Sequence, residues 1–166
     1  KINSGGDEIA ASISSDGNTL FFASSRKGGV GGTDIYICKR LGKKWSEPKN
    51  AGPEINTPYD EDFPNISPDG KILYFSSKGH TSMGGHDIFK SNYDEANATF
   101  SSPKNLGYPI NTTDDDMNFR ISKNGKFGYI ASSKNGGQGD FDIYRVTFNE
   151  VESDYSVVIG EFSTKD

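Results

Sequence analysis

The stretch Ile66-Ser67-Pro68-Asp69-Gly70-Lys71-Ile72-Leu73-Tyr74-Phe75-Ser76-Ser77 has counterparts on both sides of it in this chain. In each copy an Asp-Gly or Asn-Gly dipeptide precedes an apolar run, and a glycine-rich segment then leads to Asp-Ile and an aromatic residue. The dipeptide glycines are Gly17, Gly70 and Gly125, and the aspartates are Asp34, Asp87 and Asp142. Both series advance by 53 and then 55 residues, so the chain is an array of one repeated unit.

Each unit predicts four short strands. The first lies at 9–14, 63–67 or 119–122, and the second is the apolar run after the dipeptide, which accepts the positive φ of a tight hairpin turn. The third begins at Asp-Ile-aromatic, and the fourth carries Trp45 or Phe100. Four-stranded units at a fixed period are typical of β-propellers. We therefore predict an all-β fold of about three antiparallel blades, as part of a larger propeller, because three blades do not close a ring.

The repeats also predict the domain organisation. The propeller segment is expected over 1–149, with repeats at about 8–60, 61–115 and 116–149. The third repeat lacks the Pro-Lys-Asn motif that follows Trp45 and Phe100 in the others, and Tyr155 is its candidate fourth-strand aromatic. Residues 150–166 are predicted to form a last strand or the beginning of a following β-domain.

Composition excludes several function classes. The net charge is −5 and the lysines are scattered among acids, whereas nucleic-acid binders show a basic stripe. Cys38, the sole cysteine, lies in an apolar run and is expected to be a buried hydrophobic residue. No segment approaches the roughly 18 apolar residues of a membrane helix. We expect no nucleic-acid partner and no membrane span in this chain.

The repeat resembles a known family. The quoted stretch, together with Gly84-Gly85-His86-Asp87-Ile88-Phe89, resembles the TolB-type, WD40-like propeller repeat. The additional Trp-Ser-x-Pro-x-Asn and Gly-x-x-Ile-Asn-Thr elements are similar to the propeller region of Bacteroidota OmpA-family cell-envelope proteins, including PorE-like proteins of the type IX secretion system. The resemblance implies a propeller scaffold at the periplasmic face of the outer membrane, with envelope or secretion-system proteins as partners. Peptidoglycan binding belongs to a domain that is absent from this chain.

The connections between consecutive units suggest a partner-binding face. In a propeller blade the link from the fourth strand to the next first strand shares one face with the loop between strands two and three. The links between units are acidic, and the loops between strands two and three carry basic residues. Two interpretations stay open here: this face is a binding surface for a partner, a glycan or a cation, or its charged residues are solvated loop residues. The candidate residues are Asp7, Glu8, Asp60, Glu61, Asp62, Asp114, Asp115, Asp116, Arg26 and Lys27.

A second group of residues repeats in every unit and is therefore expected to be structural. The repeated aspartate is predicted to accept hydrogen bonds from backbone N–H groups of the glycine-rich loop. The repeated asparagine precedes each acidic link and is expected to cap a turn. The structural set is Asp34, Asp87, Asp142, Gly17, Gly70, Gly125, Asn3, Asn56 and Asn111.

Enzyme motifs fail when their spacing is tested. Asp114, Asp116 and Asn118 have EF-hand spacing, but Phe119 and Gly125 occupy positions that require Gly and Glu. His80 and His86, in one loop, are the only histidines, too few for a zinc site. We therefore predict a non-catalytic interaction module with no catalytic residue, metal or cofactor. The alternatives are a periplasmic propeller that binds or hydrolyses glycans, and a TolB-like periplasmic partner of a lipoprotein.

Overall fold

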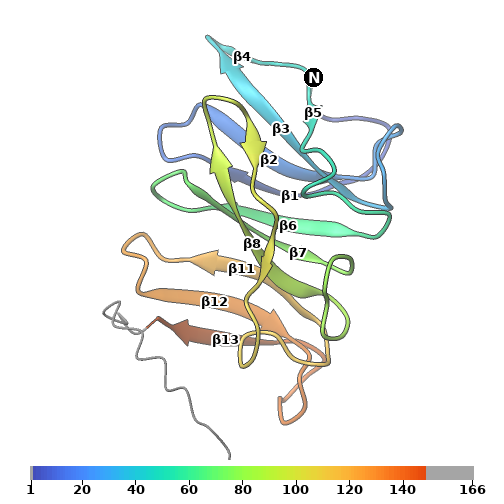
Figure 1. Cartoon of the computed structure of the whole chain (residues 1–166), viewed down its shortest axis with the longest axis vertical. Helices are drawn as coiled ribbons and strands as arrows, with labels where there is room; N and C mark the ends of the chain where they lie inside the picture. The colour runs from blue at the N-terminus through green and yellow to red at the C-terminus, as the bar shows by residue number, and fades with distance from the viewer. Residues whose placement is uncertain (1, 149–166) are drawn as a thin grey trace, which may run out of the picture.

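The structure, a computed structural model, describes residues 2–148 and consists of β-strands in that range. The strands form three antiparallel sheets, here called blades 1 to 3, which stack along the long axis of the molecule (Figure 1). The predicted all-β propeller architecture is therefore confirmed. Blade 1 contains β1 (Glu8–Ile13), β2 (Thr19–Ser24), β3 (Asp34–Leu41), β4 (Lys44–Trp45) and β5 (Lys49–Asn50).

Blades 2 and 3 repeat this order. Blade 2 contains β6 (Glu61–Ile66), β7 (Ile72–Ser77), β8 (Asp87–Asp94), β9 (Thr99–Phe100) and β10 (Lys104–Asn105). Blade 3 contains β11 (Asp116–Ile121), β12 (Phe127–Ser132) and β13 (Asp142–Thr147) within the described residues. The predictions for Tyr155 and for residues 150–166 lie outside the described residues.

The hairpin between the first two strands of each blade is the same turn. Gly17, Gly70 and Gly125 have φ values of 72°, 73° and 71°, a region that is open to glycine and strained for most other residues. Before each dipeptide a serine closes the turn: in blade 2, the Ser67 hydroxyl donates to Asp69 and accepts from the Ile72 N–H. The three turns therefore fix the register of three hairpins by local chemistry alone.

The first strand of each blade begins earlier than the sequence predicted. In blade 2 it begins at Glu61 rather than residue 63, and the register shifts between Asp62 and Asn65. Phe63 has a φ of 51° at this bulge, and Asn118 has 58° at the equivalent bulge of blade 3. A bulge lets the strand continue past an irregular residue, so acidic positions assigned to a loop are the first residues of a strand.

The fourth strand is interrupted rather than continuous. In blade 1, Trp45 pairs with Arg40, and pairing resumes only at Lys49 opposite Ile37. Pro48 lies between the two short strands, and proline has no N–H to donate to the ladder. Blade 2 has the same interruption around Pro103.

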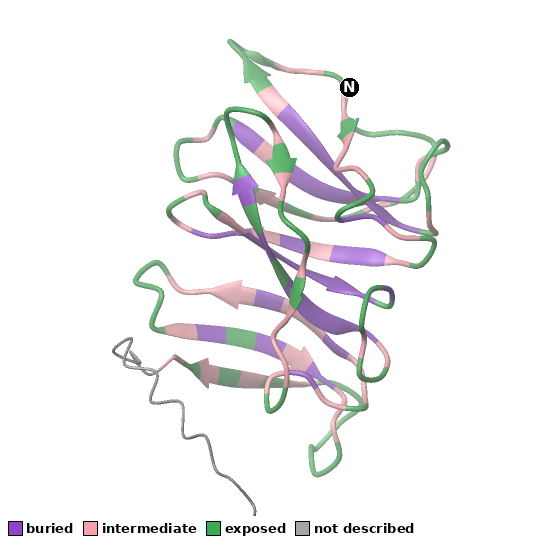
Figure 2. Cartoon of the chain, in the orientation of Figure 1, coloured by how far each residue is buried: buried purple, intermediate pink, exposed green. Residues whose placement is uncertain are grey.

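The core lies between blades. Phe21 and Ile35 of blade 1 pack with Leu73, Phe75 and Phe89 of blade 2, and all are at most 1% exposed. A second cluster joins Tyr74 and Ile88 of blade 2 to blade 3. Figure 2 shows buried residues concentrated in the middle strands of blades 1 and 2. Cys38 is buried as expected, and burial raises the pKa of its thiol.

Candidate functional site

The candidate site is a set of loops at one end of the blades. We call it the loop face; it consists of the loops between the second and third strands (25–33, 78–86 and 133–141) and the links between blades (51–60 and 106–115). The strand after each link is tied at its first residue to the loop of the preceding blade: the Glu61 N–H donates to the Thr33 carbonyl at 3.0 Å, and the Asp116 N–H donates to the His86 carbonyl at 2.7 Å. The sequence-predicted acids therefore do lie beside the glycine-rich loops.

Two of the predicted partner-binding acids are completely buried. Glu61 and Asp116 are 0% exposed. The Glu61 carboxylate accepts from the Thr57 N–H at 2.7 Å, the Thr57 hydroxyl at 2.6 Å and the Ser77 hydroxyl at 2.7 Å. Asp116 accepts from the N–H and hydroxyl of Thr112 in the same way. Both belong to the scaffold, because a strand begins at each and turns the side chain inward.

Glu8 and Arg26 are likewise structural. Glu8 accepts from the Ser4 N–H and hydroxyl, as Glu61 does from Thr57. Arg26 Nη2 lies 3.2 Å from Glu8 Oε1, and the Arg26 side chain is only 14% exposed. Its guanidinium covers the Tyr36 ring, 4.7 Å from the centroid, a favourable cation–π arrangement. Arg26 was predicted at the partner-binding face, but it caps the aromatic face of blade 1.

Asp60 and Asp115 connect neighbouring blades. Asp60 Oδ1 accepts from the Thr33 N–H at 3.2 Å, and Asp115 Oδ1 accepts from the His86 N–H at 2.7 Å. The hydrogen bond from the His86 backbone lowers the pKa of the Asp115 carboxyl. Their side chains are 37% and 40% exposed, so each carboxylate also faces solvent.

The surface of the loop face includes residues that sequence reasoning missed. Val30, Tyr59 and Met83 are 56%, 60% and 46% exposed. Val30 and Met83 are equivalent, each four residues before the repeated aspartate, which accepts their N–H groups. The predicted residues Asp7 and Lys27 are exposed, and Asp114 is partly exposed. Exposed apolar patches rimmed by polar residues mark protein-interaction sites, which makes these side chains candidates for partner contacts.

The repeated residues form the scaffold of this face. Asp142 accepts the N–H of Gln138 at 2.7 Å, the same contact that Asp34 and Asp87 make in their loops. Asn56 and Asn111 each hold the backbone of the preceding blade's third strand: Asn111 Oδ1 accepts from the Ile88 N–H at 2.8 Å, and its Nδ2 donates to the Ile88 carbonyl at 2.9 Å. Each asparagine side chain therefore joins the link to a strand that is distant in the sequence, rather than only capping a local turn as the sequence predicted.

One polar cluster occurs in blade 2 alone. Asp62 aligns with Ile9 and Met117 of the other blades, so it is not a repeated acid. His86 Nε2 lies 3.8 Å from Asp62 Oδ2, and His86 Nδ1 lies 3.1 Å from Asp115 Oδ1. Within residues 2–148, Asp62 Oδ1 and His86 Nε2 have no hydrogen-bond partner. Aligning the three repeats residue by residue is the signal that singles out Asp62.

The chemical capacity of this cluster is limited by burial. Asp62 is 9% and His86 is 8% exposed. Burial raises the pKa of the Asp62 carboxyl, while the neighbouring Thr33 hydroxyl and His86 ring act in the opposite direction. A carboxyl group of raised pKa is suited to hold and release a proton. No group of three metal-ligating side chains with metal-site geometry occurs in the described part of the chain.

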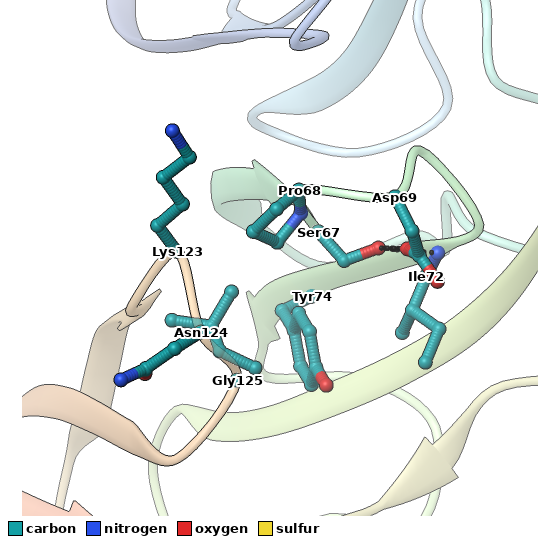
Figure 3. A pocket seen from close by; sticks show the side chains of 9 residues that line it. Ser67, Pro68, Asp69, Ile72, Tyr74, Lys123, Asn124 and Gly125 are labelled. Carbon is teal, nitrogen blue, oxygen red and sulfur yellow. Dashed lines mark hydrogen bonds between the residues drawn. The ribbon is translucent and has the colours of Figure 1, made fainter.

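A hollow of about 260 Å³ lies at the other end of the blades, between the first hairpin turns of blades 2 and 3 (Figure 3). Tyr74 and Ile72 line it beside the hydrogen-bonded pair Ser67 and Asp69. A hollow of about 250 Å³ occupies the equivalent place between blades 1 and 2. Because the feature recurs, it reflects how blades stack rather than a unique site.

No protein-family model matches this sequence, and no curated protein matches it. Solved structures do match over most of the chain, among them three with TM-scores of 0.50 or more. TolB from Acinetobacter baumannii is 21% identical with a TM-score of 0.60, covering 87% of this chain and 31% of that one. A putative TolB from Agrobacterium tumefaciens is 20% identical with a TM-score of 0.55, covering 80% and 40%.

The third is a putative 6-phosphogluconolactonase from Bacteroides uniformis, 17% identical with a TM-score of 0.50, covering 90% of this chain and 38% of that one. The chain thus spans between 31% and 40% of the length of these structures. In the described part of the chain no helix has the length and hydropathy to cross a bilayer. At these identities the likeness establishes the fold: residues 2–148 are blades of a TolB-like β-propeller.

Proposed function

We propose that the chain is a non-catalytic interaction scaffold that binds a protein partner through its loop face. One observation carries this proposal: the buried carboxylates of the face, such as Asp34 and Glu61, accept hydrogen bonds from backbone N–H groups, while Val30, Tyr59 and Met83 are exposed on it. The exposed apolar area of these side chains is removed from water only when a partner covers it. Each Å² covered then contributes roughly 25 cal/mol of favourable free energy to binding.

The resemblance of the repeats to OmpA-family envelope proteins supports the cellular context of the proposal. The partner is an outer-membrane or secretion-system protein, with the type IX secretion system as the specific assembly. The scaffold acts at the periplasmic face of the outer membrane. Peptidoglycan attachment falls to a domain outside this chain.

A second candidate function, glycan binding or hydrolysis, is favoured by a different observation. A hydrolase needs an acid that does not repeat in every blade, and Asp62 is such an acid, with a pKa raised by burial. Glycoside hydrolysis also needs a second carboxylate about 5–9.5 Å away across an open cleft. Asp62 is 9% exposed, so a sugar ring has no direct access to it.

The test uses the chain as bait for detergent-solubilised envelope. The test variant replaces Val30, Tyr59 and Met83 with serine. The matched control is Leu41→Ser, because Leu41 is 63% exposed and lies at the hairpin between β3 and β4, away from the loop face. The proposal expects a discrete set of envelope proteins to bind the parent and Leu41→Ser and to be lost from the triple variant.

Two outcomes contradict the scaffold. Equal retention by the triple variant shows that binding does not depend on Val30, Tyr59 and Met83, whose exposure carries the proposal. Binding or cleavage of glycan fragments that is lost in Asp62→Asn, with no retained protein, supports the second candidate instead.

A further inference from the structure

Two polar side chains meet inside blade 2 at positions that carry no charge in the other blades. Blade 2 packs against a neighbouring blade on each side, and its Asp62 and His86 are 9% and 8% exposed. The counterparts of Asp62 are Ile9 and Met117, and those of His86 are Thr33 and Phe141. The fold therefore does not require charge at either position. Apolar residues often replace a buried ion pair without loss of stability, so the pair points to a role other than stability.

Hydrogen bonding fixes the tautomer of the His86 ring. Its Nδ1 lies 3.1 Å from Asp115 Oδ1, and the pKa of the Asp115 carboxyl is lowered, chiefly by the hydrogen bond from the His86 backbone N–H. The Asp115 carboxylate is thus ionised near neutral pH and can only accept, so Nδ1 carries the proton of this hydrogen bond. In the neutral ring, Nε2 is then an unprotonated acceptor.

This Nε2 atom faces a second carboxylate with no donor between them. Asp62 Oδ2 lies 3.8 Å from His86 Nε2, and neither Nε2 nor Asp62 Oδ1 has a hydrogen-bond partner within residues 2–148. A buried acceptor that lacks a donor is unfavourable. One proton on Nε2 supplies the missing donor to Asp62, while Nδ1 continues to donate to Asp115.

The charged groups around the His86 ring favour a cation there. Beyond Asp62 and Asp115 lie Asp60 and Lys78, which pair with each other at 3.4 Å between Oδ2 and Nζ. The neighbouring Thr33 hydroxyl adds no charge. Burial raises the pKa of the Asp62 carboxyl, and the Asp60 charge acts in the same direction. Asp60, Asp62 and Asp115 together outnumber the single ammonium group of Lys78, so a protonated ring balances the charge of this cluster.

We propose that Asp62 and His86 form a proton-binding site that fixes the position of the loop 78–86. With the proton bound, the imidazolium joins this loop to β6 through Asp62 and to the link 106–115 through Asp115. Without it, the contact with Asp62 is lost and the loop is held less firmly. Met83, which is exposed on this loop, belongs to the surface of the proposed function. The site therefore regulates that surface, although proton binding itself needs no partner.

Two measurements on the 166-residue chain, both without a partner, test the proposal between about pH 8 and pH 5, where histidine side chains ordinarily change charge. Nitrogen-15 NMR of the His86 ring is expected to show Nε2 becoming protonated as the pH falls, while Nδ1 stays protonated throughout. Amide hydrogen exchange in the loop 78–86, corrected for its intrinsic pH dependence, is expected to slow by about tenfold over the same range, as one additional buried hydrogen bond would produce.

Two substitutions of Asp62 distinguish a bound proton from a purely structural contact. Asp62→Asn supplies a permanent N–H donor to Nε2, so slow exchange is expected at both ends of the pH range. Asp62→Met introduces the residue that blade 3 has at this position and removes the acceptor, so fast exchange is expected at both ends. His80→Gln is the matched control, because His80 lies in the same loop and its Nε2 contacts the Ile55 carbonyl at 3.0 Å. This variant is expected to keep the pH dependence of the parent.

Three results would overturn the proposal. The first is a His86 Nε2 atom with the same protonation state from pH 8 to pH 5, and the second is an Asp62→Met variant that keeps the pH dependence of the parent. The third is a zinc ion that native mass spectrometry finds bound to the parent but not to Asp62→Met, which would assign the pair to a metal instead. Because no partner protein is used, each result is independent of the envelope-binding test of the proposed function.

Discussion

The side-chain amide of Asn56 forms two hydrogen bonds with the backbone of Ile35, which lies in the neighbouring strand β3. Asn56 Oδ1 accepts from the Ile35 N–H at 2.8 Å, and Nδ2 donates to the Ile35 carbonyl at 2.9 Å. Both residues are at most 2% exposed. The amide thus substitutes for a neighbouring strand just beyond the end of β5, which pairs with β3 only at Tyr36 and Ile37.

Replacing Asn56 with alanine is expected to lower the free energy of unfolding by about 1–3 kcal/mol. The Ile35 N–H then has no partner in a dry site, which carries a cost of this size, whereas the Ile35 carbonyl keeps the Ala51 N–H at 2.9 Å. Urea denaturation measures the change. The control is Asn135→Ala, at an exposed position, and equal stability of the two variants would contradict the clamp.

The buried Glu61 carboxylate leads to a similar stability prediction for the interior of the loop face. Glu61→Ala removes the acceptor for Thr57 and Ser77 and is expected to destabilise the chain by about 3 kcal/mol. Asp114→Ala is the matched control and is expected to change stability by no more than about 0.5 kcal/mol. Thermal unfolding of both variants decides whether the two acids have the different roles that their burial indicates.

Ionisation of the Asp115 carboxyl is expected to account for part of the pH dependence of the unfolding free energy. Its pKa is lowered in the folded protein, chiefly by the His86 N–H, so the ionised form stabilises the fold. That contribution is present above the unfolded-state pKa of about 3.9 and is lost as the pH falls through the lower folded pKa.

Asp115→Asn keeps an oxygen acceptor for the His86 N–H but does not titrate. The difference in unfolding free energy between parent and variant is therefore expected to shrink as the pH falls below about 4. Urea titrations at a series of pH values measure it. Burial raises the pKa of Glu61 and Asp62, which gives the opposite slope in both proteins and cancels in the difference. A difference that stays constant with pH argues against this role of Asp115.

The close approach of neighbouring blades at Gly31 leads to a prediction about stability. A Cβ added there would overlap the Tyr59 carbonyl oxygen, and Gly84 has the same relation to Thr113 in the next blade. Gly31→Ala is expected to cost about 1–3 kcal/mol, as overpacking does. Gly5→Ala is the control, because a Cβ at Gly5 meets nothing within 4 Å. Calorimetric unfolding that shows no difference between the two variants would refute the close contact.

The sequence by itself determined the local elements of this protein. An Asp-Gly or Asn-Gly dipeptide sets its own turn through the φ of one glycine, as at Gly17, and the spacing of 53 and 55 residues repeats that turn. The apolar run after each turn then specifies a strand and its partner. Propeller blades are therefore predictable, because each depends on neighbours that are close in the chain.

Only the tertiary structure decided which acids belong to a surface. Asp60, Glu61 and Asp62 are consecutive in the sequence, yet one is half-exposed, one is fully buried and one faces His86. Their roles depend on a bulge in β6 and on contacts with Ser77 and Thr33, 16 and 27 residues away. Burial is set by residues distant in the chain, so identical side chains have different roles according to what packs on them.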